Sequence, residues 1–455
     1  MSSATQSKPG ELLRALGVSH ATAIVVGTII GSGIFLVPAE MMRAVGSAKL
    51  VYLAWIVGAV LSFFGALTYA ELGAMKPEAG GDYVYVRDGY GPLAGFLYAW
   101  TWFLVAKPAS IASVTSGIVR VLGTFGPLHG LGTAVVTLPH FTVTYGQLVA
   151  IAATLLISAL NYIGVRKAGD FQLVFTVLKI VLVLAIVGFG FSYAAGTWGH
   201  FATSYAGAQG GFAGFMVALI AALWAYDGWN DLNQVAGEVR DPQRSLPVAL
   251  IAGVGIVAVL YILMNAAVQY VMPAAAVAGS ERPASDVMLF ALGASGAAVV
   301  SAGMALSMLV TLNGTVMSGA RIPFAAARDG YFFSALADVH PRFRTPSTSI
   351  VVQAVISIVL LLVAGTFQQL FSLAIFAEWL FYMIATSTVF VFRRREPGAE
   401  RPYKTWGYPV VPALFIAASA VLLYYSFTEN LRNSIGGLAV IVAGVPFYFA
   451  LRRKK

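Results

Sequence analysis

Long apolar segments recur along the whole chain, and each is long enough to cross a lipid bilayer as a helix. A helix needs about 20 mainly apolar residues to cross roughly 30 Å of hydrocarbon. By that measure the sequence predicts an all-α integral membrane protein with twelve transmembrane helices. The predicted spans are 20–43, 50–75, 92–120, 143–163, 170–194, 211–237, 245–271, 286–320, 348–365, 368–392, 408–427 and 433–450.

The composition agrees with a lipid environment. Of the 455 residues, 59% are hydrophobic and 10% are charged, whereas soluble domains carry about 25% charged residues. The chain has no cysteine, which excludes disulfide bonds and thiolate metal sites. Its 5 histidines fall in loops or near span ends without the spacing of metal ligands. We therefore expect neither a metal nor a cofactor.

The basic residues indicate how the spans are oriented, because lysine and arginine accumulate in cytoplasmic loops. With the N-terminus inside, most of the 28 basic residues fall in cytoplasmic segments. Those that fall outside are Arg43, Lys49, Arg120, Arg282 and Arg432. The net charge of +9 thus reflects membrane topology rather than nucleic-acid binding. We predict a multi-pass protein of the cell (inner) membrane with both termini in the cytoplasm.

Two predicted spans contain glycine-rich interruptions. Residues 27–35 read Gly-Thr-Ile-Ile-Gly-Ser-Gly-Ile-Phe in the first span, and residues 224–230 read Trp-Ala-Tyr-Asp-Gly-Trp-Asn in the sixth. Glycine tolerates unwound backbone, and unwound backbone at membrane depth must line a polar cavity or be buried in protein. Taken singly, Gly27 and Gly31 could form a helix-packing face, and Asp227 could face an aqueous cavity without contacting a substrate.

The positions of the two interruptions support each other. Spans one and six are an odd number of spans apart, so they run in opposite directions across the membrane. Paired interruptions in corresponding spans are typical of transporters built from inverted repeats. An unwound segment leaves free amides at the start of one half-helix and free carbonyls at the end of the other, which suit a carboxylate and an ammonium. An α-amino acid carries both groups.

Other function classes lack support in the sequence. A membrane-embedded enzyme would need convergent acid, base or metal ligands, and the chain has no HExxH motif and no nucleophile elbow. A channel or receptor would show a filter loop or a large soluble ligand module, and neither is visible. The sequence therefore favours a transporter and indicates no enzyme.

Residues 27–35 resemble the first-helix signature of the amino acid–polyamine–organocation superfamily. Within it, the chain is most similar to the L-type amino acid transporters and their bacterial homologues. The similarity runs from about residue 15 to residue 405. Matching motifs also lie within 224–247, 313–321, 328–330 and 107–110, the last with Lys107 where the family more often has arginine.

The resemblance implies a LeuT-type fold, with two inverted five-helix repeats followed by two further helices. On this basis the cytoplasmic N-terminal segment covers 1–19, the first repeat 20–195, the second repeat 196–393, and the last two helices with the basic tail 394–455. The resemblance also implies sodium-independent exchange of neutral L-amino acids by alternating access. A proton-coupled symporter of amino acids or polyamines remains the alternative.

The resemblance further assigns roles to residues around the interruptions. The amides of Ser32, Gly33 and Ile34, after the first interruption, would bind the substrate carboxylate. The carbonyl end of the preceding half-helix at Thr28 and Ile29, with the Ala225 carbonyl from the sixth span, would bind the ammonium. The aromatic side chain of Trp224 would gate the site. Asp227 lies beside them, and Asn230 matches a polar position just past the second interruption.

Lys179 lies inside the fifth predicted span. Inserting a lysine at the middle of a span costs at least about 2.5–3.5 kcal/mol, so Lys179 is a candidate functional residue. The alternative is that its side chain extends to the membrane interface, but either end of the span is about nine residues away. By resemblance, its ammonium replaces a coupling sodium ion by donating to carbonyls near Gly31 and to hydroxyls such as that of Ser307. Gly31 and Gly228, within the two interruptions, complete the expected coupling and gating residues.

Two departures from the family pattern, in cysteine and at Asp227, matter. Animal L-type transporters have an external cysteine that links them to a glycoprotein heavy chain, and since this chain has no cysteine, we expect no disulfide-linked partner. Asp227 stands where several neutral-preferring members have glycine and the cystine and dibasic exchangers have aspartate, so exchange of cationic amino acids through Asp227 stays open. Lys107 is expected to pair structurally with a carboxylate such as Glu378 or Asp227.

Overall fold

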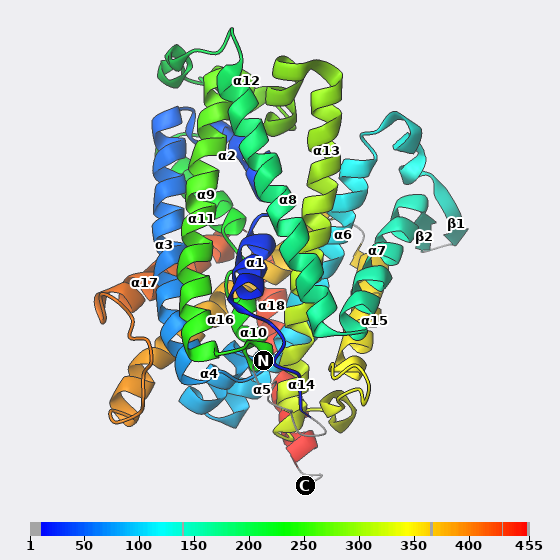
Figure 1. Cartoon of the computed structure of the whole chain (residues 1–455), viewed down its shortest axis with the longest axis vertical. Coiled ribbons are helices and arrows are strands. Elements are labelled where there is room, and N and C mark those ends of the chain that lie inside the picture. The colour runs from blue at the N-terminus through cyan, green and yellow to red at the C-terminus, as the bar shows by residue number, and fades with distance from the viewer. Residues whose placement is uncertain (1–10, 139–140, 365–366, 430, 453–455) are drawn as a thin grey trace, which may run out of the picture.

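The computed structural model describes residues 11–452 except 139–140, 365–366 and 430. This part of the chain is a bundle of helices, many of them upright and parallel to the long axis, with one small hairpin at its edge (Figure 1). The elements are α1 (Val18–Ile29), α2 (Gly33–Val45), α3 (Ala48–Met75), α4 (Asp82–Tyr90), α5 (Pro92–Thr101), η1 (Trp102–Ala106), α6 (Lys107–Leu122), η2 (Gly126–Gly132), β1 (Ala134–Leu138), β2 (Phe141–Thr144), α7 (Tyr145–Tyr162), α8 (Val165–Ser192), η3 (Trp198–Ala202), α9 (Gly211–Ala225), α10 (Asp231–Gln234), η4 (Ala236–Glu238), α11 (Pro242–Val271), α12 (Ala274–Gly279), α13 (Pro283–Gly319), α14 (Arg321–Arg328), η5 (Ser334–Ala337), α15 (Ser347–Ala364), α16 (Phe367–Arg395), α17 (Val410–Glu429) and α18 (Leu431–Arg452).

Nine helical segments in the described residues are long and apolar enough to cross a membrane. Two more apolar helices, Gly211–Ala225 and Ser347–Val363, are shorter, and α16 provides a further long helix. The prediction of an all-α membrane protein is confirmed, whereas the count of twelve spans stays a prediction.

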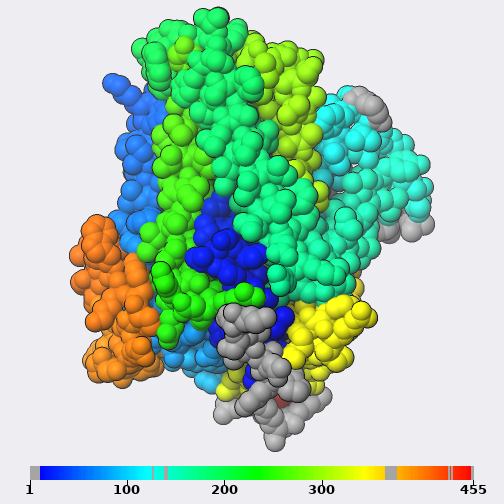
Figure 2. All heavy atoms as spheres, viewed as in Figure 1, coloured from blue at the N-terminus to red at the C-terminus, as the bar shows by residue number. Residues whose placement is uncertain are grey.

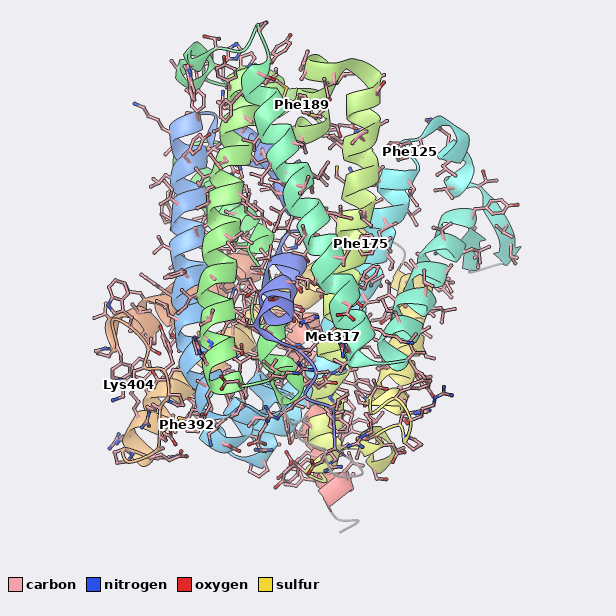
Figure 3. The ribbon with its side chains drawn as sticks, in the orientation of Figure 1. Phe125, Phe175, Phe189, Met317, Phe392 and Lys404 are labelled. Atoms are coloured by element: carbon pink, nitrogen blue, oxygen red, sulfur yellow. The ribbon has the colours of Figure 1, made fainter. Side chains whose placement is uncertain are left out.

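One face of α8 shows how the bundle separates protein from lipid. Its buried residues recur every three or four positions and include Gln172, Thr176, Lys179 and Val183, which is the period of one helix face. Its other side exposes large apolar side chains, among them Phe189 at 42% (Figure 3). Because exposed apolar side chains of this size suit contact with acyl chains, we assign that side to lipid and the buried stripe to the interior.

Both predicted interruptions are present as breaks in helices. The first break separates α1, which ends at Ile29, from α2, which begins at Gly33. The second follows α9, which ends at Ala225, and includes Gly228 with a φ of +105° before α10 begins. As predicted, the sixth span is interrupted after Ala225, and only the short α10 and η4 follow the break within 211–237.

The two broken helices run in opposite directions beside each other. The half before one break packs against the half after the other, since α2 lies against α9 and α1 contacts α10. Between α8 and α11, α1 reaches the surface as a patch in Figure 2. This antiparallel pairing agrees with the odd spacing of the two spans, while the full five-plus-five repeat and its boundaries stay predictions.

Ion pairs connect the elements at the lower end of the bundle in Figure 1, where α4 and α14 lie. Arg321 on α14 forms a bidentate pair with Glu238, with Nε–Oε2 and Nη2–Oε1 distances of 2.7 and 3.0 Å, and both side chains are fully buried. Arg87 on α4 pairs with Asp329 just after α14. These contacts tie the segment after the second break to the end of the bundle.

Candidate functional site

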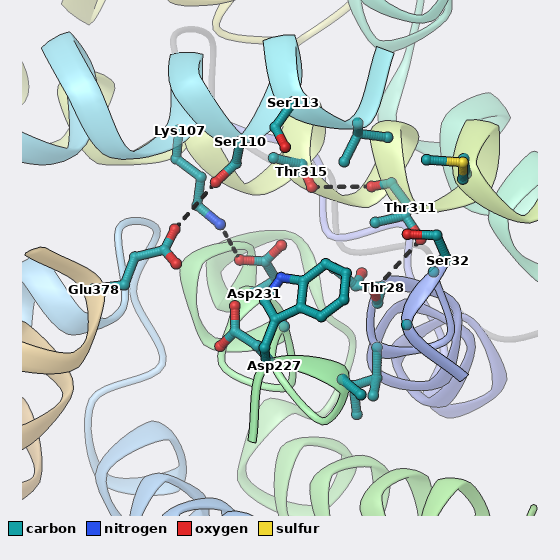
Figure 4. A pocket seen from close by; sticks show the side chains of 18 residues that line it. Thr28, Ser32, Lys107, Ser110, Ser113, Asp227, Asp231, Thr311, Thr315 and Glu378 are labelled. Atoms are coloured by element: carbon teal, nitrogen blue, oxygen red, sulfur yellow. Dashed lines mark hydrogen bonds and ion pairs between the residues drawn. The ribbon is translucent and has the colours of Figure 1, made fainter. Parts of the chain in front are cut away.

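A cavity of about 110 Å³ lies between the two breaks and is walled by α6, α13 and α16 as well. Figure 4 shows the side chains around it. Backbone and small polar groups form one side, and charged side chains form the other. The lining residues are Thr28, Ile29, Gly31, Ser32, Gly33, Lys107, Ser110, Ser113, Val114, Trp224, Ala225, Asp227, Gly228, Asp231, Met308, Thr311, Thr315 and Glu378.

The first break presents opposite backbone polarities to the cavity. The first amides of a helix have no partner inside that helix, and at the start of α2 these belong to Gly33 and Ile34, while Ser32 is the preceding residue. The carbonyls at the end of α1 carry the opposite partial charge. A group with a carboxylate and an ammonium close together therefore fits across this break.

The second break contributes a carbonyl to the same place. The hydroxyl of Tyr261 on α11 lies 3.1 Å from the Ile29 carbonyl oxygen and 2.9 Å from the Ala225 carbonyl oxygen. Tyr261 is fully buried. The two breaks thus share one neighbouring hydroxyl, and both carbonyls belong to residues that line the cavity.

Lys179 reaches the first break from α8. Its Nζ donates to the carbonyl oxygens of Gly27 at 2.8 Å, Ile30 at 2.6 Å and Ser307 at 3.0 Å. The lysine bonds to the main-chain carbonyl of Ser307 and not to its hydroxyl, which was the predicted partner; that hydroxyl instead lies 2.9 and 3.2 Å from the Ile30 and Gly31 carbonyl oxygens. The lysine uses all three of its donors, and so joins α1, α8 and α13 at one point.

The opposite side of the cavity carries charged side chains. Lys107 on α6 forms a short ion pair with Asp231 at the start of α10. One turn further along α6, the Ser110 hydroxyl donates to Glu378 on α16 at 3.2 Å. Asp227 accepts a hydrogen bond of 3.0 Å from the Tyr382 hydroxyl. The prediction that Lys107 pairs with a carboxylate is confirmed, but the ion-pair partner is Asp231 rather than Glu378 or Asp227.

A family model described as amino acid permease matches residues 16–449. The chain belongs to the amino acid permease family. This membership confirms the resemblance found in the sequence, and it makes the chain a membrane transporter rather than an enzyme.

Individual relatives agree with this family over nearly their whole length. The permease is 31% identical over 452 residues to the serine/threonine exchanger SteT of Bacillus subtilis, covering 98% of each chain. It is 32% identical over 453 residues to the human b(0,+)-type amino acid transporter 1, covering 98% of this chain and 89% of the relative. Identity to the human cystine/glutamate transporter is 28% over 449 residues, with 96% and 85% covered.

Most of the residues expected around the substrate line the cavity of the permease. They are Thr28, Ile29, Ser32, Gly33, Trp224, Ala225 and Asp227, together with Gly31 and Gly228. Ile34 and Asn230 are not lining residues. Asn230 is fully buried beside the cavity, where it donates to Asp82 at 2.9 Å and accepts from Tyr382 at 3.2 Å.

Sequence reasoning missed Asp231, Ser110 and the cavity position of Glu378. Helical spacing offered a signal for Ser110, because residues three or four apart lie on the same helix face and Ser110 follows Lys107 by three positions. Asp231 is separated from Asp227 by the second break, so spacing gave no signal for it. Nothing local to α16 indicates that Glu378 faces the permease cavity, since its partner Ser110 comes from a distant helix.

Proposed function

We propose that the permease is a sodium-independent exchanger of L-amino acids, with neutral amino acids among its substrates. The observation that carries the proposal is the pair of antiparallel breaks, whose amides and carbonyls meet at one cavity. The names of two relatives, a serine/threonine exchanger and a cystine/glutamate transporter, support exchange of amino acids.

In this proposal the substrate backbone binds across the first break. Its carboxylate accepts hydrogen bonds from the amides at Ser32 and Gly33, where the start of α2 adds partial positive charge. Its ammonium donates to the carbonyls of Ile29 and Ala225. Trp224, which also lines the cavity, covers the bound molecule.

The proposed placement follows the distribution of basic residues. The permease would be a multi-pass protein of the cytoplasmic membrane with both termini inside. Its two repeats would cover 20–195 and 196–393, each with one broken helix, and 394–455 would pack outside them. No disulfide can link it to a heavy chain, since the sequence contains no cysteine.

Exchange should appear as stimulation of uptake from the opposite side. We expect radiolabelled alanine, serine or leucine to enter proteoliposomes several times faster when the vesicles are preloaded with unlabelled amino acid. The reason is that an obligatory exchanger returns to face outward only when loaded.

The same assay separates the alternatives. Uptake that ignores internal amino acid would favour uniport, and uptake driven by an imposed proton gradient with empty vesicles would favour the symporter. Empty liposomes and vesicles preloaded with a sugar serve as controls.

The carboxylate site can be tested with a single main-chain change. Ser32 has a φ of −84°, close to the value of about −65° that proline imposes. Ser32→Pro therefore removes one amide without a new backbone conformation, and we expect substrate affinity to fall about tenfold, since a hydrogen bond to a charged group contributes ~1.5–3 kcal/mol. Ser32→Ala, which keeps the amide, is the matched control. Normal binding by Ser32→Pro would place the carboxylate elsewhere.

A further inference from the structure

A carboxylic acid side chain is enclosed in the protein outside the cavity. Asp82 begins α4, between the spans Ala48–Met75 and Pro92–Leu122, at the lower end of the bundle in Figure 1. It is 0% exposed, and it is not one of the residues that line the cavity. The proposed contacts with the substrate therefore leave this acid without a role.

The donors that reach Asp82 are neutral. Its Oδ2 accepts hydrogen bonds from the Tyr98 hydroxyl at 3.0 Å and from the side-chain amide of Asn230 at 2.9 Å. Its Oδ1 is buried and has no hydrogen-bond partner among the described residues. Lys107 acts on Asp82 through its charge, but its ammonium is already paired with Asp231. An ionised Asp82 thus has no counter-charge of its own in the described part of the chain.

Two effects oppose each other at this carboxyl group. The titratable or charged groups around it are Tyr69 on α3, Tyr85 on α4, Tyr98 on α5, Lys107 on α6, Asp231 on α10 and Tyr382 on α16. Burial favours the neutral acid, whereas the two donors and the start of α4 favour the ionised form. Burial prevails and raises the pKa of Asp82 from 3.8 to about 7.

Hydrogen bonds connect Asp82 to the cavity through the second break. Asn230, which donates to Asp82, accepts from the Tyr382 hydroxyl at 3.2 Å. The same hydroxyl lies 3.0 Å from Oδ1 of Asp227, which lines the cavity. Because this hydroxyl has one hydrogen, it donates fully to only one of the two acceptors at a time. A change of charge at Asp82 can therefore reach the cavity through Asn230 and Tyr382.

We propose that Asp82 is a proton-binding site that controls the rate of amino acid exchange. The ionised carboxylate forms charge-assisted hydrogen bonds with Asn230 at the second break and with Tyr98 on α5, so it holds α4 against both. A proton taken from water onto Oδ1 neutralises the carboxylate and weakens these bonds. Alternating access requires movement around the breaks, so the protonated form exchanges faster. The effect on rate rests on the proposed function, whereas proton binding can be measured without transport.

The first measurement is exchange of alanine by the full-length permease in proteoliposomes, with equal pH on both sides of the membrane. We expect wild type to exchange at least threefold faster at pH 6 than at pH 8. Asp82→Asn, which imitates the neutral acid, should keep the faster rate at both pH values. Asp338→Asn, which removes an exposed carboxylate after η5, should behave like wild type.

Tyr98→Phe distinguishes proton binding from a structural role. The variant keeps the aromatic ring and removes one donor to the ionised carboxylate, which raises the pKa of Asp82 further. The midpoint of the pH profile should therefore move up by about one pH unit. A variant that only loosened the packing would change the rate without moving this midpoint.

The stability of the purified protein tests proton binding without transport. The folded state keeps the proton on Asp82 up to about pH 7, whereas the unfolded chain releases it near about pH 4. The melting temperature of wild type should therefore fall relative to that of Asp82→Asn as the pH rises from about 5 to about 7, and the difference should then stay constant.

The outcomes separate this inference from the proposed function. If wild type and Asp82→Asn have parallel stability profiles, Asp82 binds no proton in this range and the inference is wrong. It is also wrong if the stability profiles differ but exchange by wild type does not depend on pH. If no amino acid exchanges while the stability profiles differ as expected, the proposed function fails and the proton site stands. If Asp82→Asn is not recovered as folded protein, the midpoint in Tyr98→Phe decides.

Discussion

Lys179→Ala is expected to reduce amino acid exchange by about a hundredfold or more, because hydrogen bonds from a charged donor contribute ~1.5–3 kcal/mol each and every ~1.4 kcal/mol is tenfold in rate. The lysine holds the carbonyls of Gly27 and Ile30 from α1 and that of Ser307 from α13. Without it, three buried acceptors lose a donor and the position of the first break is no longer fixed. Turnover in proteoliposomes is the measurement.

Two further variants sharpen this test. Lys179→Arg should also be impaired, because a planar guanidinium cannot occupy the place of a compact ammonium. Lys167→Ala, on the exposed side of the same helix, should exchange like wild type. Recovery of each variant as a monodisperse protein in detergent separates a lost mechanism from a lost fold.

The ion requirement of wild type belongs to the same prediction. In the proposed mechanism the fixed ammonium of Lys179 would take the place of a bound sodium ion at the first break, so replacing sodium by choline or potassium should leave exchange unchanged. A strict sodium requirement, or full activity in Lys179→Ala, would contradict the mechanism.

Gly33→Val is expected to abolish transport, because the two breaks touch at this glycine. A Cβ at Gly33 would lie 3.0 Å from the Cβ and 3.1 Å from the Cα of Ala225, closer than such atoms normally approach. The added atoms would force α2 and α9 apart at the wall of the cavity. Substrate binding to purified protein and exchange in vesicles should both be lost.

Replacements at two other glycines test whether the effect of Gly33→Val comes from crowding at the two breaks. Gly228→Ala should be similarly damaging, since Gly228 has a φ of +105° and its Cβ would lie 2.8 Å from Thr28 Cγ2. Gly188→Val on α8 is the control, because an added Cβ there meets nothing within 4 Å. Wild-type binding by Gly33→Val would show that the cavity described here is not the substrate site.

The sequence was sufficient for the membrane class and for the location of both breaks, because each of these rests on local chemistry. Apolar length predicts a span, and glycine beside a serine or an aspartate within a span predicts interrupted backbone. The sequence did not predict features that depend on contacts between segments far apart in the chain. Gly33 was expected within the interrupted backbone, yet it begins α2, and its close approach to Ala225 had no signal in the sequence.

The charged side of the cavity could not be predicted for the same reason. Lys107, Asp231 and Glu378 come from three helices that are far apart in the chain. Their pairing depends on how α6, α10 and α16 pack, which neither periodicity nor composition encodes. Lys179 was recognisable from its cost within a span, whereas its third acceptor, a main-chain carbonyl of α13, was not.

The position of Tyr261 has a consequence for the empty and loaded states. Its hydroxyl has one hydrogen, yet it lies within hydrogen-bonding distance of two acceptors, the carbonyls of Ile29 and Ala225. At any moment one carbonyl is therefore without this donor. An arriving ammonium has three hydrogens and can satisfy both, so occupancy would link the two breaks more firmly than the tyrosine alone can. The Ile29 carbonyl also accepts from the Gly31 amide at 2.8 Å, so the Ala225 carbonyl is the one that would gain a hydrogen-bond donor when the substrate binds.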